Sequence, residues 1–214
     1  MKFSIEELRP TRNGMTISRD SKLGNSTKVT YFSMGKDTSI SQESYDRMTM
    51  YIGASGWGEF IIGEEPEIIK LQPDELLIVP AGTLCGMQTS NGIVYTEIIC
   101  TGKDINMNAN VKTNEVFALK NLISYEEGSI ANMDVVSTPD MKYVLMAFDE
   151  GTGLTPHRAP GNAIVFALEG KAVIGYEGKD YELSEGECFR FEKNGLHSVT
   201  ANGKFKMALL LVLE

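Results

Sequence analysis

The sequence contains few of the residues on which covalent and metal sites most often depend. Its 214 residues include three cysteines, two histidines and one tryptophan. Cys85, Cys100 and Cys188 are widely spaced and form no CxxC pair, so they indicate neither a disulfide framework nor a thiolate zinc site. Their odd number and wide spacing favour reduced thiols, and we therefore expect a cytoplasmic protein.

Long apolar segments and basic clusters are also missing. No apolar run reaches the roughly 18 residues of a membrane span, and the opening MKFSIEE lacks the apolar stretch of a signal peptide. The 20 Lys and Arg residues are scattered among 29 Asp and Glu residues, giving a net charge of −9. Because nucleic-acid binders neutralise phosphates with a clustered basic surface, we expect neither a nucleic-acid nor a membrane partner.

Short strands dominate the pattern from about Lys28 to the end. Apolar or alternating runs recur, each closed by Gly, Asn, Asp or Pro, which predicts a sandwich or barrel rather than alternating strands and helices. The expected strands are 29–34, 48–54, 57–62, 67–71, 76–79, 84–88 and 94–100, then 143–148, 163–168, 172–176, 180–183, 188–191, 197–200 and 206–213. The polar, Asn-rich segment 101–114 is typical of a linker between two such units.

Two motifs occur in the second half at characteristic spacings. The first, G-x5-H-x-H-x3-E-x6-G, is matched in its outer glycines and first histidine, while its second histidine and its glutamate are alanines. Its positions are Gly151, His157, Ala159, Ala163 and Gly170. The second, G-x5-P-x-G-x2-H-x3-N, keeps its opening glycine and its histidine. Its positions are Gly186, Glu192, Asn194, His197 and Ala201.

With these motifs the second half resembles the cupin superfamily, and in particular small conserved-barrel cupins without a well-defined reaction. The resemblance covers residues 143–213 closely. It implies an all-β fold of two tandem cupin jelly-roll β-barrels, because the first half is a more distant copy of the second. We expect a degenerate barrel over residues 1–105, and a barrel with its linker and lead-in strands over 106–214.

The first half carries no histidine at its motif positions. Cys85 replaces the histidine of the second motif, eleven residues after Asp74, as His197 follows Gly186. Gly56 is the counterpart of Gly170 in the first half. Counting back from Gly56 places Glu43, Tyr45 and Thr49 at the ligand positions of the first motif. Cys85 would serve as a thiolate ligand or a nucleophile only with a base or positive charge beside it, so a buried structural cysteine is the favoured interpretation.

His157 and His197 are the predicted metal-site residues. In a cupin barrel they would converge on one cavity, where neutral imidazole suits iron, manganese, nickel or zinc. Ala159 and Ala163 supply no ligand, and catalytic sites usually have at least three from the protein. The same two alanines also free volume, which favours binding of a small molecule near these residues.

Three functions remain open at this point. The preferred one is a small-molecule-binding or sensing bicupin with a degenerate metal site in its C-terminal barrel, in which Glu43, Tyr45 and Cys85 are further candidate ligand-binding residues. The alternative is a metal-dependent enzyme, for which the resemblance implies a dioxygenase, isomerase or lyase acting on a small polar substrate. A scaffold without a ligand is the third. A tandem cupin imitates the dimer of single-domain cupins, so we expect a monomer or homodimer.

Overall fold

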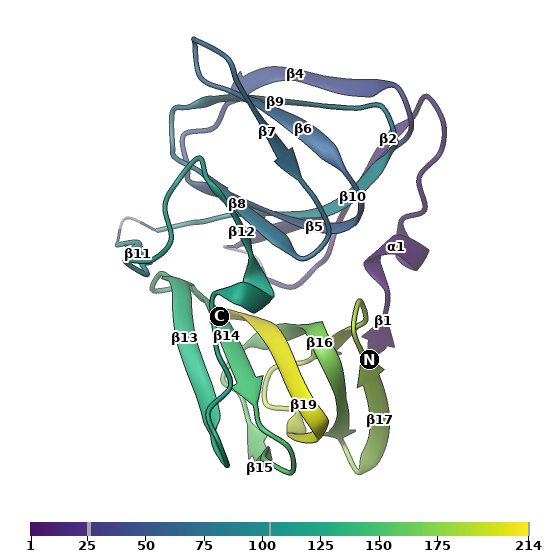
Figure 1. Ribbon diagram of the computed structural model, residues 1–214, viewed down its shortest axis with the longest axis vertical. Helices are drawn as coiled ribbons and strands as arrows, with labels where there is room; N and C mark the ends of the chain where they lie inside the picture. The colour runs from purple at the N-terminus through teal and green to yellow at the C-terminus, as the bar shows by residue number, and fades with distance from the viewer. Residues whose placement is uncertain (25–26, 103, 214) are drawn as a thin grey trace. The chain divides into compact units, whose positions relative to one another are not determined.

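The computed structural model describes residues 1–24, 27–102 and 104–213, and this part of the chain is almost entirely β-structure (Figure 1). Helix within it is confined to α1 (Ile5–Leu8) and the 3-10 turn η1 (Leu119–Asn121). The all-β fold class predicted from the sequence is therefore confirmed. No helix among the described residues is long and apolar enough to cross a membrane.

The chain divides into two compact units that are not simply its first and second halves. The N-terminal unit consists of Ile5–Thr101 and Ala109–Ala118, and the C-terminal unit of Met1–Ser4, Gly102–Asn108 and Leu119–Glu214. The predicted boundary between residues 105 and 106 is a single cut, whereas the segments 1–4, 102–105 and 109–118 belong to the unit on the other side of it. Strand pairing explains the first and the last of these, because β1 (Lys2–Phe3) pairs with β18 (Cys188–Phe191) and β12 (Val116–Ala118) pairs with β8 (Glu75–Val79).

The N-terminal unit is built from two antiparallel sheets. The six-stranded sheet has the order β12-β8-β5-β10-β3-β2, and the four-stranded sheet has the order β4-β9-β6-β7. Its further strands are β2 (Thr16–Asp20), β3 (Lys28–Met34), β4 (Thr38–Ser44), β5 (Thr49–Gly56), β6 (Gly58–Ile62), β7 (Glu67–Leu71), β9 (Leu84–Thr89) and β10 (Ile93–Ile99). One core cluster combines Tyr51 and Tyr95 from the first sheet with Phe60 and Met87 from the second, so the core of this unit lies between the sheets.

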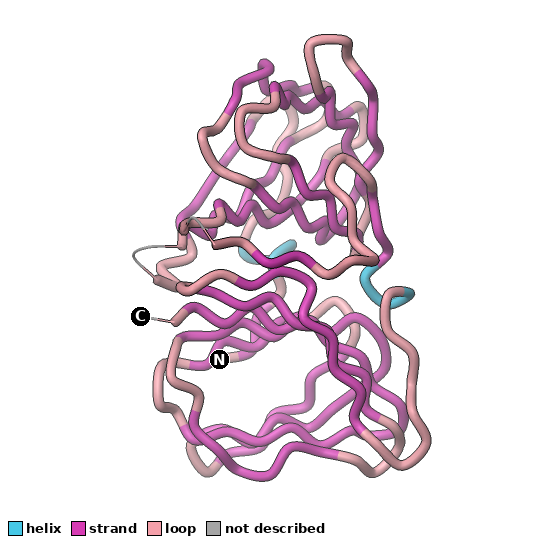
Figure 2. The backbone as a smooth tube through the Cα atoms, turned by 90° about the vertical axis from the view of Figure 1, so that its left-hand side faces the viewer, coloured by secondary structure: helices cyan, strands magenta, loops and turns pink. Residues whose placement is uncertain are grey.

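The C-terminal unit is one nine-stranded sheet that bends around its own core (Figure 2). Its path is β1-β18-β16-β19-β14-β13-β11, with β15 paired to β19 and β17 paired to β16. Its further strands are β11 (Asn106–Met107), β13 (Ile130–Ser137), β14 (Met141–Phe148), β15 (Gly153–Arg158), β16 (Asn162–Tyr176), β17 (Lys179–Ser184) and β19 (Leu196–Val212). The core cluster of this unit is dominated by Phe148, Phe189, Phe191, Phe205 and Met207.

The two longest strands of the C-terminal unit were each predicted as two shorter ones. β16 and β19 remain continuous because register shifts on β16 next to Gly170 let the pair bend without breaking. Gly170 has a φ of +77°, and a Cβ there would lie 2.0 Å from the carbonyl oxygen of Lys204. Only glycine fits this bend. Gly170 lies between two predicted strands, 163–168 and 172–176, and its conformation lets a single strand continue through the bend.

Two strands that the sequence analysis did not predict carry motif residues. β4 and β15 have mostly exposed or half-exposed residues, so no apolar alternation marks them in the sequence. β15 also contains Pro156, which lowers the expectation of a strand. These strands place Glu43 and His157, respectively, opposite β9 and β19.

Candidate functional site

β15 and β19 bring the only two histidines of the sequence into contact. His157 and His197 are cross-strand partners, and their ring centroids lie 4.3 Å apart at an interplanar angle of 53°. His197 is 7% exposed and stacks on Phe191 at 4.2 Å, whereas His157 is exposed. The structure therefore brings together the two residues that the motif spacing assigned to one site, but buries only one of them.

Backbone carbonyls fix the orientation of both imidazoles. The Nδ1 atom of His157 lies 2.8 Å from the carbonyl oxygen of Thr155, and that of His197 lies 2.9 Å from the carbonyl oxygen of Gly195. Because a carbonyl oxygen only accepts, each Nδ1 donates to it, which leaves Nε2 as the ring atom that a metal ion would bind. Burial lowers the pKa of His197; its hydrogen bond to Gly195 raises the pKa and the neighbouring His157 lowers it. The second ring nitrogen of a metal-ligating histidine is commonly held by a backbone carbonyl in this way.

The ligand set does not fit a tightly held catalytic metal. Two imidazoles converge, but the positions that would complete the cluster are Ala159 and Ala163. Within residues 1–24, 27–102 and 104–213, no group of three or more His, Cys, Asp or Glu side chains is placed to hold a metal ion. Since catalytic metal sites usually take three protein ligands, the histidine pair by itself is suited only to weak metal binding.

The two alanines have different surroundings. Ala163 is 1% exposed, belongs to the core cluster and is the cross-strand partner of Phe191 and Leu211. It is therefore part of the packed core of this unit. Ala159 is half-buried, and its carbonyl oxygen accepts a hydrogen bond from the backbone N–H of Asn194 at 2.9 Å.

The N-terminal unit repeats this arrangement with other side chains. Glu43 and Cys85 are cross-strand partners, like the two histidines, and in both pairs the register shifts just before the motif residue. The N–H of Gly82 donates to the carbonyl oxygen of Tyr45 at 2.7 Å, which repeats the Asn194–Ala159 bond. Cys85 thus occupies the register position of His197, as the eleven-residue spacing predicts.

A pocket of about 80 Å³ lies within the N-terminal unit, where Glu43, Tyr45 and Cys85 are part of its lining. These are the three residues of this half that the sequence analysis named as ligand-binding candidates. Two residues that it did not name, Tyr51 and Glu97, line the same pocket. The motif positions of this half therefore surround a space, together with polar groups contributed by the opposite sheet.

Glu97 is the most unusual group in this pocket. It lies on β10 opposite Tyr51 of β5 and Thr30 of β3, and it is 5% exposed. Burial raises the pKa of Glu97 to about 7, and the charge of Lys28 opposes this only in part. No hydrogen bond to its carboxyl group occurs among the described residues. The signal was present in the sequence, because Glu97 is the single charged residue in the apolar strand IVYTEII.

Burial holds Cys85 and three tyrosines of the pocket in their neutral forms. Burial raises the pKa of Cys85 to about 11, with a small opposing effect of its hydrogen bond with Tyr51. Burial likewise raises the pKa values of Tyr45, Tyr51 and Tyr95, and the nearby Glu97 contributes to each increase. Cys85 is therefore a thiol rather than a reactive thiolate, which agrees with the structural interpretation of this cysteine.

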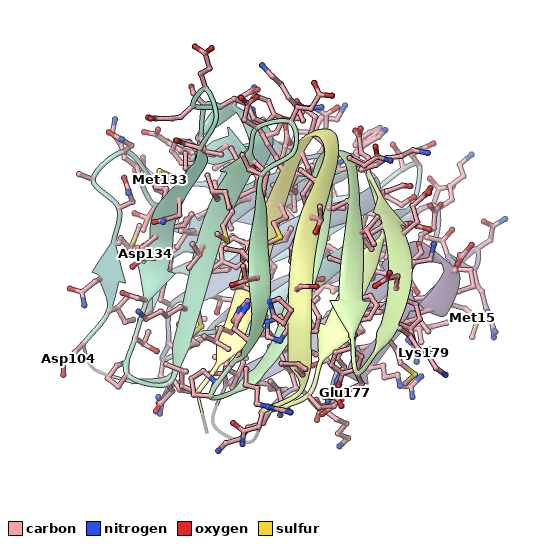
Figure 3. The ribbon with its side chains drawn as sticks, turned by 90° about the horizontal axis from the view of Figure 1, so that it is seen from below. Met15, Asp104, Met133, Asp134, Glu177 and Lys179 are labelled. Carbon is pink, nitrogen blue, oxygen red and sulfur yellow. The ribbon has the colours of Figure 1, made fainter. Side chains whose placement is uncertain are left out.

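A second, more open pocket of about 260 Å³ lies on the C-terminal unit, where Tyr176, Glu177 and Lys179 contribute to its lining. Glu177 lies in the β16–β17 turn and Lys179 begins β17, so both lie at the same end of the unit (Figure 3). Glu177 forms an ion pair at 3.8 Å with Arg158, the residue after His157. All three of these charged side chains are exposed. His197 is also part of the lining, so this pocket is an open depression that includes one of the two histidines.

Comparison with protein families confirms the resemblance on which the fold was predicted. Residues 144–213 match the family described as "Cupin domain". No curated protein matches the sequence.

Solved structures match the chain over most of its length. The "Cupin 2 conserved barrel domain protein" from Leptotrichia buccalis has a TM-score of 0.87 and 24% identity, over 99% of this chain and 96% of that one. A salicylate 1,2-dioxygenase from Pseudaminobacter salicylatoxidans has a TM-score of 0.63 and 11% identity, over 87% of this chain and 71% of that one. The structure of its adduct with gentisate has a TM-score of 0.66 and 11% identity, over 96% of this chain and 76% of that one. At these identities the likeness shows a shared fold.

Proposed function

Because residues 144–213 of this chain form a cupin domain, we propose that the protein binds or senses a small molecule in the pocket of its N-terminal unit, and that His157 and His197 are the remnant of a metal site. The proposal keeps the function expected from the sequence but moves the ligand from the histidine pair to the Glu97 pocket. The reason is the distribution of buried polar groups between the two units.

One observation carries the proposal: the buried carboxyl group of Glu97 has no counterpart in the other unit. The shared register makes Tyr51 and Glu97 equivalent to Val165 and Leu209, because each pair occurs at the same distance from the strand-bending glycine. The fold is thus built with apolar residues at these positions. An unpaired buried carboxyl costs stability, and natural proteins accept such a cost mainly at functional sites.

The alternative function is a metal-dependent enzyme centred on the histidine pair. It is favoured by one feature, the contact of the two imidazoles at a centroid distance of 4.3 Å while Nδ1 of each ring is held by a carbonyl. Against it stands the missing third ligand. The dioxygenases that share this fold have 10% or 11% identity to this chain, and their reaction is not carried over on that basis.

The two functions separate in one set of measurements on protein purified without an affinity tag or a chelator. The variants are Glu97→Leu, which installs the residue of the equivalent position, and His197→Ala. For a binder, ligand-detected NMR with a library of small molecules should find hits that Glu97→Leu loses and His197→Ala keeps. Elemental analysis should find far less than one metal ion per chain.

The opposite pattern would favour the enzyme. Stoichiometric metal that survives dialysis and is released by His197→Ala would overturn the proposal, and so would hits that Glu97→Leu leaves unchanged. Glu97→Leu removes a buried charge and adds apolar contacts, so we expect it to fold. Its near-ultraviolet circular dichroism spectrum provides the check.

A further inference from the structure

We propose that the pocket of the N-terminal unit takes a small organic cation, an alkylammonium group, with Glu97 as its buried counter-ion. This inference rests on the proposed binding function and adds the chemical class of the ligand. It follows from the charge, the aromatic surfaces and the size of the pocket.

The pocket lining has only one sign of charge. Glu43 and Glu97 contribute carboxyl groups, and no Lys, Arg or His residue is among the described residues that line the pocket. Glu43 is exposed at the mouth, whereas Glu97 is 5% exposed. Lys28 is an exposed residue of β3 that acts on Glu97 from outside the lining. An anionic ligand would meet two carboxyl groups and no compensating cation, so the lining selects against it.

Among the described residues, the opposite charge that acts on Glu97 is that of the exposed Lys28, which offsets the effect of burial only in part. The ionisable residues that face it are Lys28 from β3, Tyr51 from β5, Cys85 from β9, Tyr95 from its own strand, and Tyr45, which follows β4. None of them forms a hydrogen bond with its carboxyl among the residues that the structure describes. A buried carboxylate needs a cation or several donors. The ligand is the remaining source of that partner.

Aromatic rings provide the second attractive surface. Tyr95 stacks on Phe32 at 5.0 Å, and Tyr51 packs against Phe60 at 4.7 Å and against Tyr95 at 6.0 Å. All four rings line the pocket. The faces of Phe and neutral Tyr attract cations, and quaternary ammonium groups are commonly bound in aromatic cages of this kind. A lining of four aromatic rings and a buried carboxyl group matches an ammonium ion with methyl or methylene substituents.

The size of the pocket limits the group that enters it. A volume of about 80 Å³ is the space of roughly three water molecules. This encloses about three heavy atoms of an ammonium head group, so the rest of the head group would lie at the mouth of the pocket. Tyr45 is 38% exposed at the mouth, so a longer ligand would extend from there into solvent.

Binding of a cation must compete with the proton on Glu97. With a carboxyl pKa of about 7, the group is mostly ionised at pH 8 and mostly protonated at pH 6. A cation binds the ionised form and displaces the proton. Its affinity should therefore fall about tenfold from pH 8 to pH 6, with release of a proton on binding at the lower pH.

Tetramethylammonium and tert-butanol test the inference, because they have the same number of heavy atoms and nearly the same shape but differ in charge. Pivalate serves as the anionic probe. Binding to the full chain is measured by isothermal titration and ligand-detected NMR at pH 6 and pH 8. Tetramethylammonium should bind at least tenfold more tightly than either of the other probes at pH 8.

Glu97→Gln keeps the shape of the side chain and removes its charge. It should weaken tetramethylammonium binding at least tenfold and remove the dependence on pH, while the exposed Glu67→Gln changes neither. If Glu97→Gln does not fold, Tyr51→Leu replaces it as the test variant, since loss of one aromatic wall should also weaken the cation selectively.

The outcomes distinguish the ligand class from the binding function. If tert-butanol or pivalate binds as well as tetramethylammonium and Glu97→Leu abolishes this binding, the cationic class is wrong and the binding function stands. If Glu97→Gln and Glu97→Leu both bind tetramethylammonium unchanged, both proposals fail. If none of the three probes binds and a small-molecule library gives no hit that depends on Glu97, both proposals fail.

Discussion

Replacing Glu97 by glutamine should make the N-terminal unit more stable at high pH. The carboxyl pKa is about 7 in the folded protein against 4.5 in its ordinary environment, because burial disfavours the charged form. A raised folded pKa means that the contribution of Glu97 to stability is fully present below about pH 4.5. It is lost as the pH rises through 7, since the unfolded chain then releases the proton more readily.

The expected size of the effect follows from this difference in pKa. The pKa difference corresponds to about 3 kcal/mol when the group is fully ionised, and about 2 to 3 kcal/mol of it should be lost between pH 5 and pH 8. Glutamine has the same shape and no charge to bury. The free energy of unfolding of Glu97→Gln should therefore approach the wild-type value at pH 5 and exceed it by about 2 to 3 kcal/mol at pH 8.

Urea unfolding followed by tryptophan fluorescence measures this difference. The only tryptophan of the sequence, Trp57, lies in the N-terminal unit, so its emission reports the unit that contains Glu97 even if the two units unfold separately. Glu67→Gln makes the same change at an exposed position of β7 and serves as the control. Parallel curves for wild type and Glu97→Gln from pH 5 to pH 8 would refute the reasoning. A variant that is less stable at pH 8 would show that the carboxylate has a partner in the folded protein.

Three further predictions concern other parts of the chain. Ala159→His adds a third imidazole and should raise the affinity for zinc or nickel, measured by titration, at least tenfold. Ala163→Glu should instead lower the free energy of unfolding in urea by several kcal/mol, because its position is 1% exposed. An unchanged affinity would contradict the motif alignment. Cys85, with its pKa raised from 9.0 to about 11, should react with iodoacetamide at pH 8 about a hundredfold more slowly in the folded than in the urea-unfolded protein, as mass spectrometry can quantify. Gly170→Ala should destabilise the protein by at least about 2 kcal/mol more than Gly178→Ala. Both glycines have a φ near +78°, but only Gly170 has a carbonyl oxygen 2.0 Å from the added Cβ. Equal losses of stability in thermal unfolding would show that the bend tolerates a side chain.

Several features of this protein were predictable because they depend on local rules. Short alternating runs closed by Gly, Asn and Asp predicted the β-fold, and the spacing of the motifs predicted that His157 and His197 would be near one another. The spacing also predicted the equivalence of Cys85 and His197, since residues at fixed distances from a turn keep the same register. The motif spacings are informative because the hydrogen-bonded register of two strands depends on residue position more than on the identity of the side chain.

Other features depended on partners that are distant in the sequence. β4 and β15 were missed, because a polar strand has no apolar period and forms only when a neighbouring strand supplies its hydrogen bonds. The division into units differed from a single boundary for the same reason: β1 and β12 are too short to be recognised without β18 and β8.

The amino-acid sequence by itself determined the fold class and the two motif sites, including the loss of two ligands at Ala159 and Ala163. Only the tertiary structure decided which of the two sites encloses polar groups. Glu97 is one acidic residue in an apolar strand. It lines a pocket only because the fold places Tyr51 opposite it and brings Cys85 and Glu43 from the other sheet. Burial, not residue type, sets its pKa, and burial is a property of the folded chain.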